Sequence, residues 1–211
     1  MNIKRPENRK SQRGSEGLWL KAAYQTLLES GVDAVRVMSL AKTLNLSRTS
    51  FYWHFEDRDA LLAALIKCWQ DKNTGNLVSQ TCLYAETITE AVFNLFDCWL
   101  NQELFDAKLD FAIRNWSSQS EDLKTIVDRM DQERINAIQS MFKRFGYSDH
   151  EARTRAFTVY YTQVGYISLM VDEQLADRVK KMPAYVEIFT GSCPSESEIK
   201  RFNSRHLENF Q

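Results

Sequence analysis

The 211-residue sequence contains few of the residues that interrupt helices: seven glycines and three prolines. Both residues disfavour helix interiors, so their scarcity favours a fully helical chain. The sequence also lacks a long apolar run, since even the run that contains Leu61–Ile66 falls far short of the roughly 18 residues that span a bilayer. The N-terminal segment MNIKRPENRKSQRG is polar where a signal peptide needs an apolar core. We therefore expect a cytoplasmic protein without a membrane partner.

The residue patterns of metal sites and of common enzymes are absent as well. The four cysteines form no CxxC pair, and they show no zinc-like spacing with His54, His150 or His206. The sequence has no Walker loop, no GxGxxG, no HExxH and no nucleophile motif. We expect a protein without catalytic activity, metal ion or cofactor.

Charge is distributed unevenly along the chain. Residues 1–60 contain ten lysines and arginines against seven acids, a net charge of +3, whereas the remainder has 17 against 21, a net charge of −4. A basic first quarter indicates contact with a polyanion, although a solvated tail beside an ordinary surface is the alternative. Residues 1–14 are expected to form a flexible tail, and five of the basic residues lie there: Lys4, Arg5, Arg9, Lys10 and Arg13.

Residues 15–57 begin with two predicted helices. Apolar residues recur at helical spacing from Ser15, and Gly31 is a natural terminator of this first helix. The second helix is short, from 37 to 44, and it ends at Asn45, which can adopt the left-handed conformation that a tight turn needs. Two helices of these lengths, followed by a third after the turn, predict a helix-turn-helix unit.

The third predicted helix opens within the stretch LSRTSFYWHF, Leu46–Phe55, with Ser47 as its N-cap, and runs through Phe55. On a helical wheel Phe51 and Phe55 share one face and belong in the core. The other faces are too aromatic for a merely solvated surface, and they carry Thr49, Ser50, Tyr52, Trp53 and His54. Hydroxyl groups can contact phosphates, rings can rest on thymine methyls and Arg48 can pair with guanine, so this surface suits a DNA major groove. The alternative is that the aromatic residues close a subunit interface or pack under the following helix.

The segment from Gly31 to Leu65 resembles the DNA-binding module of tetracycline-repressor (TetR) family transcriptional regulators. The shared pattern is a glycine after the first helix, a serine at the turn, an aromatic-rich Tyr-x-His-Phe, and a basic residue opening the next helix before a Leu-Leu pair. In this sequence the pattern is met by Gly31, Ser47, Tyr52–Phe55, Arg58 and Leu61–Leu62. The resemblance implies that the residues in or beside the major groove are Arg48, Thr49, Ser50, Tyr52, Trp53 and His54. It further implies a phosphate contact by Arg58 and backbone contacts by Arg36 and Ser39.

Two positions depart from the usual pattern of this family. Thr49 stands where many members have glycine, and this can alter the reach of side chains in the groove. Arg58 stands where lysine is usual, which keeps the charge. The basic N-terminal tail is longer than the fold requires, and we expect it to follow the phosphate backbone or a minor groove.

Residues 58–211 continue the helical pattern at greater length, and the resemblance implies that they bind an effector and form the dimer. One apolar stripe extends from Tyr84 to Trp99, and further stripes predict helices as far as residue 209. The resemblance also implies that the helices near 149–171 and 195–209 build an intersubunit four-helix bundle.

An effector pocket needs a few polar groups and rings within the apolar stripes of this region. The candidate ligand-binding residues are Trp69, Phe96, Trp99, Trp116, Tyr161 and Gln163. Aromatic residues at helical spacing are also ordinary core residues, so that interpretation stays open. Arg114 and Arg134 lie beside or within the stripes, and we expect them to pair with a carboxylate such as Asp110 or Asp131 rather than with a ligand.

The sequence thus predicts an all-α protein, with an N-terminal three-helix helix-turn-helix DNA-binding domain over 15–57 and a larger helical effector-binding and dimerisation domain over 58–211. We expect a homodimeric regulator, most simply a repressor, that binds an inverted-repeat operator in double-stranded DNA and is released by an unknown small molecule. A thiol-based redox sensor using Cys68, Cys82 or Cys98 is one alternative. A helical interaction module without DNA contact is the other.

Overall fold

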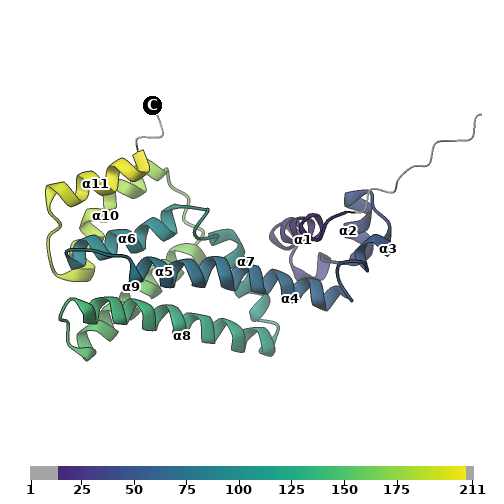
Figure 1. The fold of residues 1–211 in the computed structure, drawn as a ribbon, viewed down its shortest axis with the longest axis horizontal. Coiled ribbons are helices and arrows are strands. Elements are labelled where there is room, and N and C mark those ends of the chain that lie inside the picture. Colours follow the sequence, from purple (N-terminus) through teal and green to yellow (C-terminus); the bar gives the residue numbers. More distant parts are fainter. Residues whose placement is uncertain (1–13, 208–211) are drawn as a thin grey trace, which may run out of the picture. The chain divides into compact units, whose positions relative to one another are not determined.

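The structure is a computed structural model that describes residues 14–207. The basic residues Lys4, Arg5, Arg9, Lys10 and Arg13 of the expected tail lie outside the described residues. Every regular element within 14–207 is helical, which confirms the all-α fold class (Figure 1). The chain divides into two compact units between Ile66 and Lys67, whereas the sequence placed a division between residues 57 and 58. We call these the first unit and the second unit.

Caps and turns that the sequence predicts determine where the helices of the first unit begin and end. Its elements are α1 (Glu16–Ser30), the 3-10 turn η1 (Val32–Ala34), α2 (Val37–Leu44), α3 (Arg48–Phe51) and the beginning of α4 (Arg58–Trp69). The Ser15 hydroxyl accepts a hydrogen bond from the Leu18 N–H and so caps α1. Gly31 ends α1 at φ 76°, where glycine has no steric cost. Asn45 ends α2 at φ 52° and ψ 42°, which confirms the predicted left-handed turn before α3.

An aromatic core holds the first unit together. Trp19 and Phe51 are fully buried, and their rings meet edge to face with centroids 5.2 Å apart. Phe55 is also buried and stacks on Phe51 at 5.5 Å. The prediction that Phe51 and Phe55 face the core is therefore confirmed.

The helix α3 is shorter than the sequence indicates. We expected it to run through Phe55, but it ends at Phe51, and the next three residues form a turn. The Phe51 carbonyl accepts from the N–H of both His54, at 2.9 Å, and Phe55, at 3.0 Å. Such an i to i+3 bond tightens a helix end into a turn, so side chains after Phe51 no longer follow the 100° spacing of a helix.

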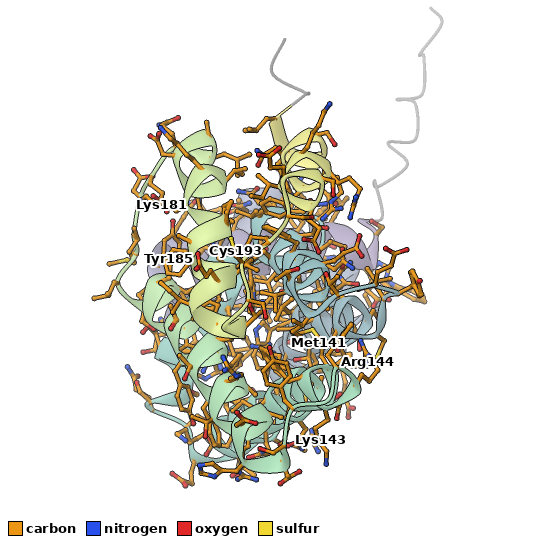
Figure 2. All side chains as sticks on the ribbon, turned by 90° about the vertical axis from the view of Figure 1, so that its left-hand side faces the viewer. Met141, Lys143, Arg144, Lys181, Tyr185 and Cys193 are labelled. Atoms are coloured by element: carbon orange, nitrogen blue, oxygen red, sulfur yellow. The ribbon has the colours of Figure 1, made fainter. Side chains whose placement is uncertain are left out.

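The second unit surrounds an apolar core with longer helices. A π-helical stretch, η2 (Gln70–Gly75), joins α4 to α5 (Asn76–Cys82). The following helices are α6 (Ile88–Leu100), α7 (Ala107–Ser117), α8 (Glu121–Arg144), α9 (Asp149–Ser168), α10 (Leu175–Thr190) and α11 (Glu196–Leu207). In Figure 2, Met141, Lys143 and Arg144 mark α8, and Lys181 and Tyr185 mark α10. Buried residues of α6, α8, α9 and α10 form one continuous core.

Several predicted boundaries in the second unit shift. Tyr84 was expected on the stripe that ends at Trp99, but it precedes α6 and is 83% exposed. The helix expected to reach Val171 ends at Ser168. The helix α9 starts at Asp149, as expected. Ser148 and Glu151 form a capping box that stabilises this start.

The C-terminal helix α11 packs on α6 of its own chain. The Phe202 ring stacks on Phe93 with centroids 4.5 Å apart. At the C-terminal end of α11, His206 Nε2 lies 2.6 Å from a carboxylate oxygen of Asp97. At the N-terminal end, the buried Glu198 carboxylate accepts hydrogen bonds from the following donors: the Thr87 hydroxyl, the Thr89 hydroxyl at 2.7 Å, the Ser195 hydroxyl at 2.7 Å and the Ser195 N–H at 2.6 Å.

These donors stabilise the charged form of Glu198. Burial opposes ionisation, but the hydroxyl groups and the Ser195 N–H lower the pKa of Glu198 from 4.5 to about 2. The charged carboxylate therefore contributes to the stability of the folded state at neutral pH.

Replacing this residue with glutamine, Glu198→Gln, should lower the free energy of unfolding at pH 7 by about 1.5–3 kcal/mol, the range for hydrogen bonds to a charged group. Because the folded pKa lies below 4.5, the contribution is complete above about pH 5 and is lost as the pH falls toward 2. Urea denaturation of both proteins between pH 7 and pH 3 measures the difference. The exposed neighbour Glu196 provides the control, Glu196→Gln. An equal loss in the control, or a difference that does not shrink in acid, would contradict this role.

Candidate nucleic-acid interface

Four side chains from α3 and the following turn are exposed together. Ser47 caps α3 by accepting a hydrogen bond from the Ser50 N–H at 3.2 Å. Arg48 and Thr49 lie exposed on the first turn of α3. Tyr52 and Trp53 follow in the turn and are 51% and 67% exposed. We call the set of Arg48, Thr49, Tyr52 and Trp53 the α3 surface. It combines a guanidinium, two hydroxyls and two rings, the groups that contact bases, sugars and phosphates.

Ser50 lies apart from the α3 surface. Only 7% of the residue is exposed, and its hydroxyl oxygen is buried without a hydrogen-bond partner among the described residues. A buried hydroxyl cannot reach a phosphate, so in this conformation Ser50 does not present the group for which it was predicted.

His54 is half-buried and turns toward the beginning of the described chain. Its Nε2 lies at hydrogen-bond distance from the carbonyl oxygen of Gly14. Because a carbonyl oxygen can only accept, Nε2 carries the proton and donates it. The imidazole is thus engaged within the first unit rather than directed outward with Tyr52 and Trp53.

Arg58 binds backbone carbonyls rather than standing free at the start of α4. Its Nε donates to the Val35 carbonyl at 2.6 Å, and its Nη2 donates to the Val32 carbonyl at 2.7 Å. The planar guanidinium makes both bonds at once, which the single ammonium group of a lysine cannot reproduce with the same geometry. Arg58 therefore fastens η1 to α4 in addition to carrying a charge.

The helix α2 contributes the two remaining predicted contacts. Arg36 and Ser39 are exposed at its N-terminal end, and Arg36 Nε donates to the Asp33 carbonyl at 2.8 Å. DNA contact by these two residues, like contact by the α3 surface, stays a prediction.

The six predicted ligand-binding residues lie at different places in the second unit. Trp69, Phe96, Trp99 and Gln163 are buried, Trp116 is half-buried and Tyr161 is exposed. Phe96 and Trp99 meet edge to face at 5.8 Å, and Arg178 contacts both the Trp99 carbonyl and the Gln163 side chain at 3.4 Å.

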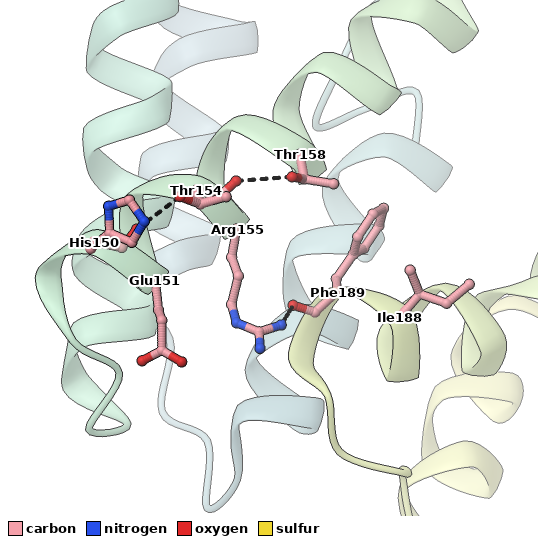
Figure 3. A pocket seen from close by; sticks show the side chains of 7 residues that line it. All are labelled: His150, Glu151, Thr154, Arg155, Thr158, Ile188 and Phe189. Carbon is pink, nitrogen blue, oxygen red and sulfur yellow. Dashed lines mark hydrogen bonds between the residues drawn. The ribbon is translucent and has the colours of Figure 1, made fainter.

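Two surface hollows of the described chain are lined by other residues. One measures about 320 Å³ and is lined by His150, Glu151, Thr154, Arg155, Thr158, Ile188 and Phe189 (Figure 3). The other, about 450 Å³, lies beside Glu198 between α6 and α11. Neither contains a residue predicted to bind the ligand.

A buried cluster of charges occupies the core of the second unit. Asp110 Oδ2 accepts from Arg114 Nε at 2.8 Å, and Asp110 Oδ1 accepts from Arg134 Nη1 at 3.1 Å. Arg114 also binds both carboxylate oxygens of Asp131, at 2.7 and 2.9 Å. The prediction that both arginines pair with these carboxylates is confirmed. Burial alone would raise the pKa of Asp110, but Arg134 and Arg114 lower it below its usual value.

Uncharged partners that the sequence did not indicate complete this cluster. Trp69 Nε1 donates to Asp110 Oδ1 at 2.8 Å, and the Tyr160 hydroxyl donates to Asp131 at 2.7 Å. Arg134 Nε donates to the Thr74 hydroxyl at 2.9 Å. The spacing of Asp110 and Arg114 was a usable signal for their ion pair, whereas these partners come from segments far away in the sequence. The indole N–H of Trp69 is thus engaged by Asp110, and ligand contact by the Trp69 ring stays a prediction.

One of the three thiols considered for redox sensing is buried. Burial raises the pKa of Cys98 to about 12, so this thiol stays protonated at neutral pH. Because the thiolate is the reactive form, Cys98 is unsuited to react with oxidants. Cys68 and Cys82 are exposed.

Removing the charge of Asp110 should strongly lower the free energy of unfolding of the second unit. Asp110→Asn leaves Arg134 buried without its closest carboxylate, and we expect a loss of about 3–5 kcal/mol in the free energy of unfolding. The exposed pair Lys124–Asp128 provides the control, because Asp128→Asn should cost about 1 kcal/mol or less. Guanidinium denaturation of the three proteins measures both values. Similar losses in the two variants would contradict the assigned role of Asp110.

Comparisons with known proteins identify relatives of the first unit. Residues 20–65 match the sequence model of the family "Bacterial regulatory proteins, tetR family". Over 54 residues the chain is 37% identical to the tetracycline repressor protein class A from transposon 1721 of Escherichia coli. This match covers 26% of the chain and 25% of the repressor, so the chain matches about a quarter of that relative's length.

Solved structures resemble the chain over most of its length. A TetR-family transcriptional regulator from Mesorhizobium loti aligns with 94% of this chain and 98% of its own, with a TM-score of 0.54 and 13% identity, which shows a shared fold. The TetR-family repressor AlkX from Dietzia aligns over 89% of this chain and 100% of its own, with a TM-score of 0.46 and 18% identity. Residues 20–65, which contain the helix-turn-helix unit, therefore match the tetR family of bacterial regulatory proteins.

Proposed function

We propose that the protein is a homodimeric, ligand-responsive repressor that binds an inverted-repeat operator. The observation that carries this proposal is the α3 surface, where Arg48, Thr49, Tyr52 and Trp53 are exposed directly after the tight turn at Asn45. In this role Arg48 contacts a guanine edge, the Thr49 and Tyr52 hydroxyls contact phosphates, and the Trp53 ring rests on sugars or thymine methyls. Two copies related by a two-fold axis would read successive major grooves about 34 Å apart.

We place the dimer face on α9 and α10. These helices are antiparallel, since Arg155 near the start of α9 donates to the Phe189 carbonyl near the end of α10 at 2.6 Å. Their exposed apolar side chains include Tyr161 and Ile188, the latter 70% exposed. An exposed apolar face of this kind is typical of a subunit interface. The resemblance implied α11 as the second bundle helix, but Phe202 of α11 is buried within its own chain.

We further propose that the effector is a neutral molecule with carbonyl or hydroxyl oxygens. Arg134 Nη2 and Trp99 Nε1 are buried N–H donors without an acceptor among the described residues. A buried donor without an acceptor costs about 1–3 kcal/mol, so a ligand that supplies acceptor atoms gains affinity. The two arginines of the buried cluster are already balanced by Asp110 and Asp131, which disfavours a charged ligand. The effector releases DNA only if it binds the two conformers of the dimer unequally.

The DNA contacts are tested by alanine substitutions on the α3 surface. Genomic fragments that the protein retains supply the operator, and fluorescence anisotropy measures its affinity. Arg48→Ala and Tyr52→Ala should each weaken binding by about 1–3 kcal/mol without unfolding the protein. Arg129→Ala removes the same group from an exposed position on α8 and should leave the affinity unchanged. Unchanged affinity in both α3 variants would remove these residues from the interface.

The dimer face is tested by light scattering after size exclusion. The protein should have about twice the chain mass of 24.6 kDa. Ile188→Glu places a charge in the proposed interface and should produce monomers, because an unpaired buried charge is costly. Leu83 is exposed after α5 and away from α9 and α10 in sequence, so Leu83→Glu should remain dimeric. A monomeric unaltered protein, or an Ile188→Glu dimer of normal stability, would place the interface elsewhere.

A further inference from the structure

We propose that two copies of the chain exchange an apolar loop across their two-fold axis, so that the end of α9 in each copy fills the hollow between α9 and α10 of the other. We call Leu169–Val171, at the end of α9, the apolar loop, and we call the hollow of Figure 3 the α9–α10 hollow. The inference rests on the proposed dimer face. It adds which parts of that face meet and how the two copies of α9 are oriented.

The apolar loop exposes three consecutive apolar side chains. Leu169 is 77% exposed, Met170 is 69% exposed, and Val171 is exposed as well. Met170 adopts φ 49°, a left-handed conformation that is uncommon for a residue with a side chain, and the chain leaves the direction of α9 there. Three neighbouring apolar side chains without cover from their own chain are typical of a contact with another molecule.

The α9–α10 hollow lies on the same face of α9 as Leu169, but at the opposite end of the helix. The α9 side chains that line it include Glu151, Thr154 and Thr158 (Figure 3). Leu169 directly follows the last residue of α9 and keeps a helical backbone, with φ −76° and ψ −4°. It lies 18 residues after Glu151, which is about five full turns, so both side chains leave the helix in the same direction. About 22 Å of helix separates Thr154 from Leu169.

A two-fold axis perpendicular to α9 brings the apolar loop and the hollow together twice. An axis across the middle of the helix turns α9 of one copy antiparallel to α9 of the other, and each loop then meets the opposite hollow. An axis parallel to α9 would instead place loop against loop and leave both hollows open. The perpendicular axis therefore covers the apolar loop and fills the hollow in one step.

The helix surface between the two features is suited to burial in such a pair. The sequence contains no charged residue between Arg155 and Asp172, so this surface can be covered without burying an unpaired charge. Gly165 lies on the same face, and a Cβ atom there would meet no other atom of the described chain within 4 Å. Packing within the chain therefore does not require a glycine, although glycine weakens a helix interior. A second helix that approaches the backbone closely gives Gly165 a role.

The charged groups at the two ends of this surface are complementary. The apolar loop leads directly into the exposed carboxylate of Asp172, whereas the hollow contains the guanidinium of Arg155. Arg155 donates to the Phe189 carbonyl at 2.6 Å, which is an uncharged partner. The carboxylate in the hollow, Glu151, is already engaged in the capping box with Ser148. An acid that enters with the loop of the second copy is therefore attracted to Arg155.

Cysteine cross-linking tests which parts of the two copies meet. The background is the full chain with its exposed cysteines replaced by serine: Cys68, Cys82 and Cys193. Leu169→Cys and Thr154→Cys are placed in separate chains, one with a tag that changes its size, and the chains are co-expressed. Oxidised glutathione then joins thiols whose Cα atoms lie about 4.4–6.8 Å apart, and electrophoresis without reductant separates mixed from like pairs. Thr158→Cys covers the neighbouring turn of the hollow.

We expect the mixed pair of Leu169→Cys with Thr154→Cys or Thr158→Cys to be the main covalent product. Leu83→Cys is the matched control, because Leu83 is an exposed leucine outside α9 and α10, and it should not cross-link to Thr154→Cys.

In the otherwise unaltered chain, Leu169→Lys brings a cation to Arg155 twice in each dimer. It should raise the dissociation constant of the dimer about a hundredfold in sedimentation equilibrium, since two buried leucines are lost. Leu83→Lys should leave that constant unchanged.

Three results would overturn the inference while the proposed dimer stands. A covalent pair of Leu169→Cys with itself would show that the loops lie against each other. A dimeric background without mixed cross-links would show that loop and hollow do not meet, and an unchanged dissociation constant for Leu169→Lys would show that the loop stays exposed. If the unaltered chain is itself monomeric, the proposed dimer fails, together with the inference.

Discussion

The second unit depends on one buried carboxylate. Asp110 accepts hydrogen bonds from Trp69 at the end of α4, Asn73 of η2, Arg114 of its own helix and Arg134 of α8. Because each of these donors would be costly to bury alone, the four elements hold one another in place through a single side chain. The π-helical turn at η2 is part of this arrangement, since it places Asn73 and Thr74 in the polar cluster. A change in the position of any one element therefore disturbs the partners of the others.

Local signals in the sequence predict the first unit well. Gly31, Asn45 and Ser47 act through their own backbone or side chain, and each stands at the predicted boundary. The predictions fail after Phe51, where a regular helix was expected to continue to Phe55. Once α3 ends at Phe51, the angular positions assigned to later residues no longer apply, and the hydrogen bond of His54 to Gly14 could not be foreseen.

Contacts between distant segments limit prediction in the second unit. Charge complementarity predicts that Arg114 and Arg134 pair with aspartates, but nothing in the sequence places Trp69 or Tyr160 in the same cluster. Similarly, Phe202 lies on an apolar stripe that could pack either against a partner subunit or against helices of its own chain. Only the packing of α11 on Phe93 of α6 decides between them. Sequence periodicity thus identifies the buried face of a helix but not what covers it.

Because α3 is short, the α3 surface consists of two groups of side chains, and different backbone segments orient the two groups. The directions of Arg48 and Thr49 follow from one helical turn, whereas those of Tyr52 and Trp53 follow from the turn that closes on the Phe51 carbonyl. A substitution that reshapes the closing turn can redirect the two rings while the arginine and the threonine keep their places. Under the proposed DNA contact, the recognition of neighbouring base pairs can therefore diverge independently among descendants of this sequence, one pair of residues at a time.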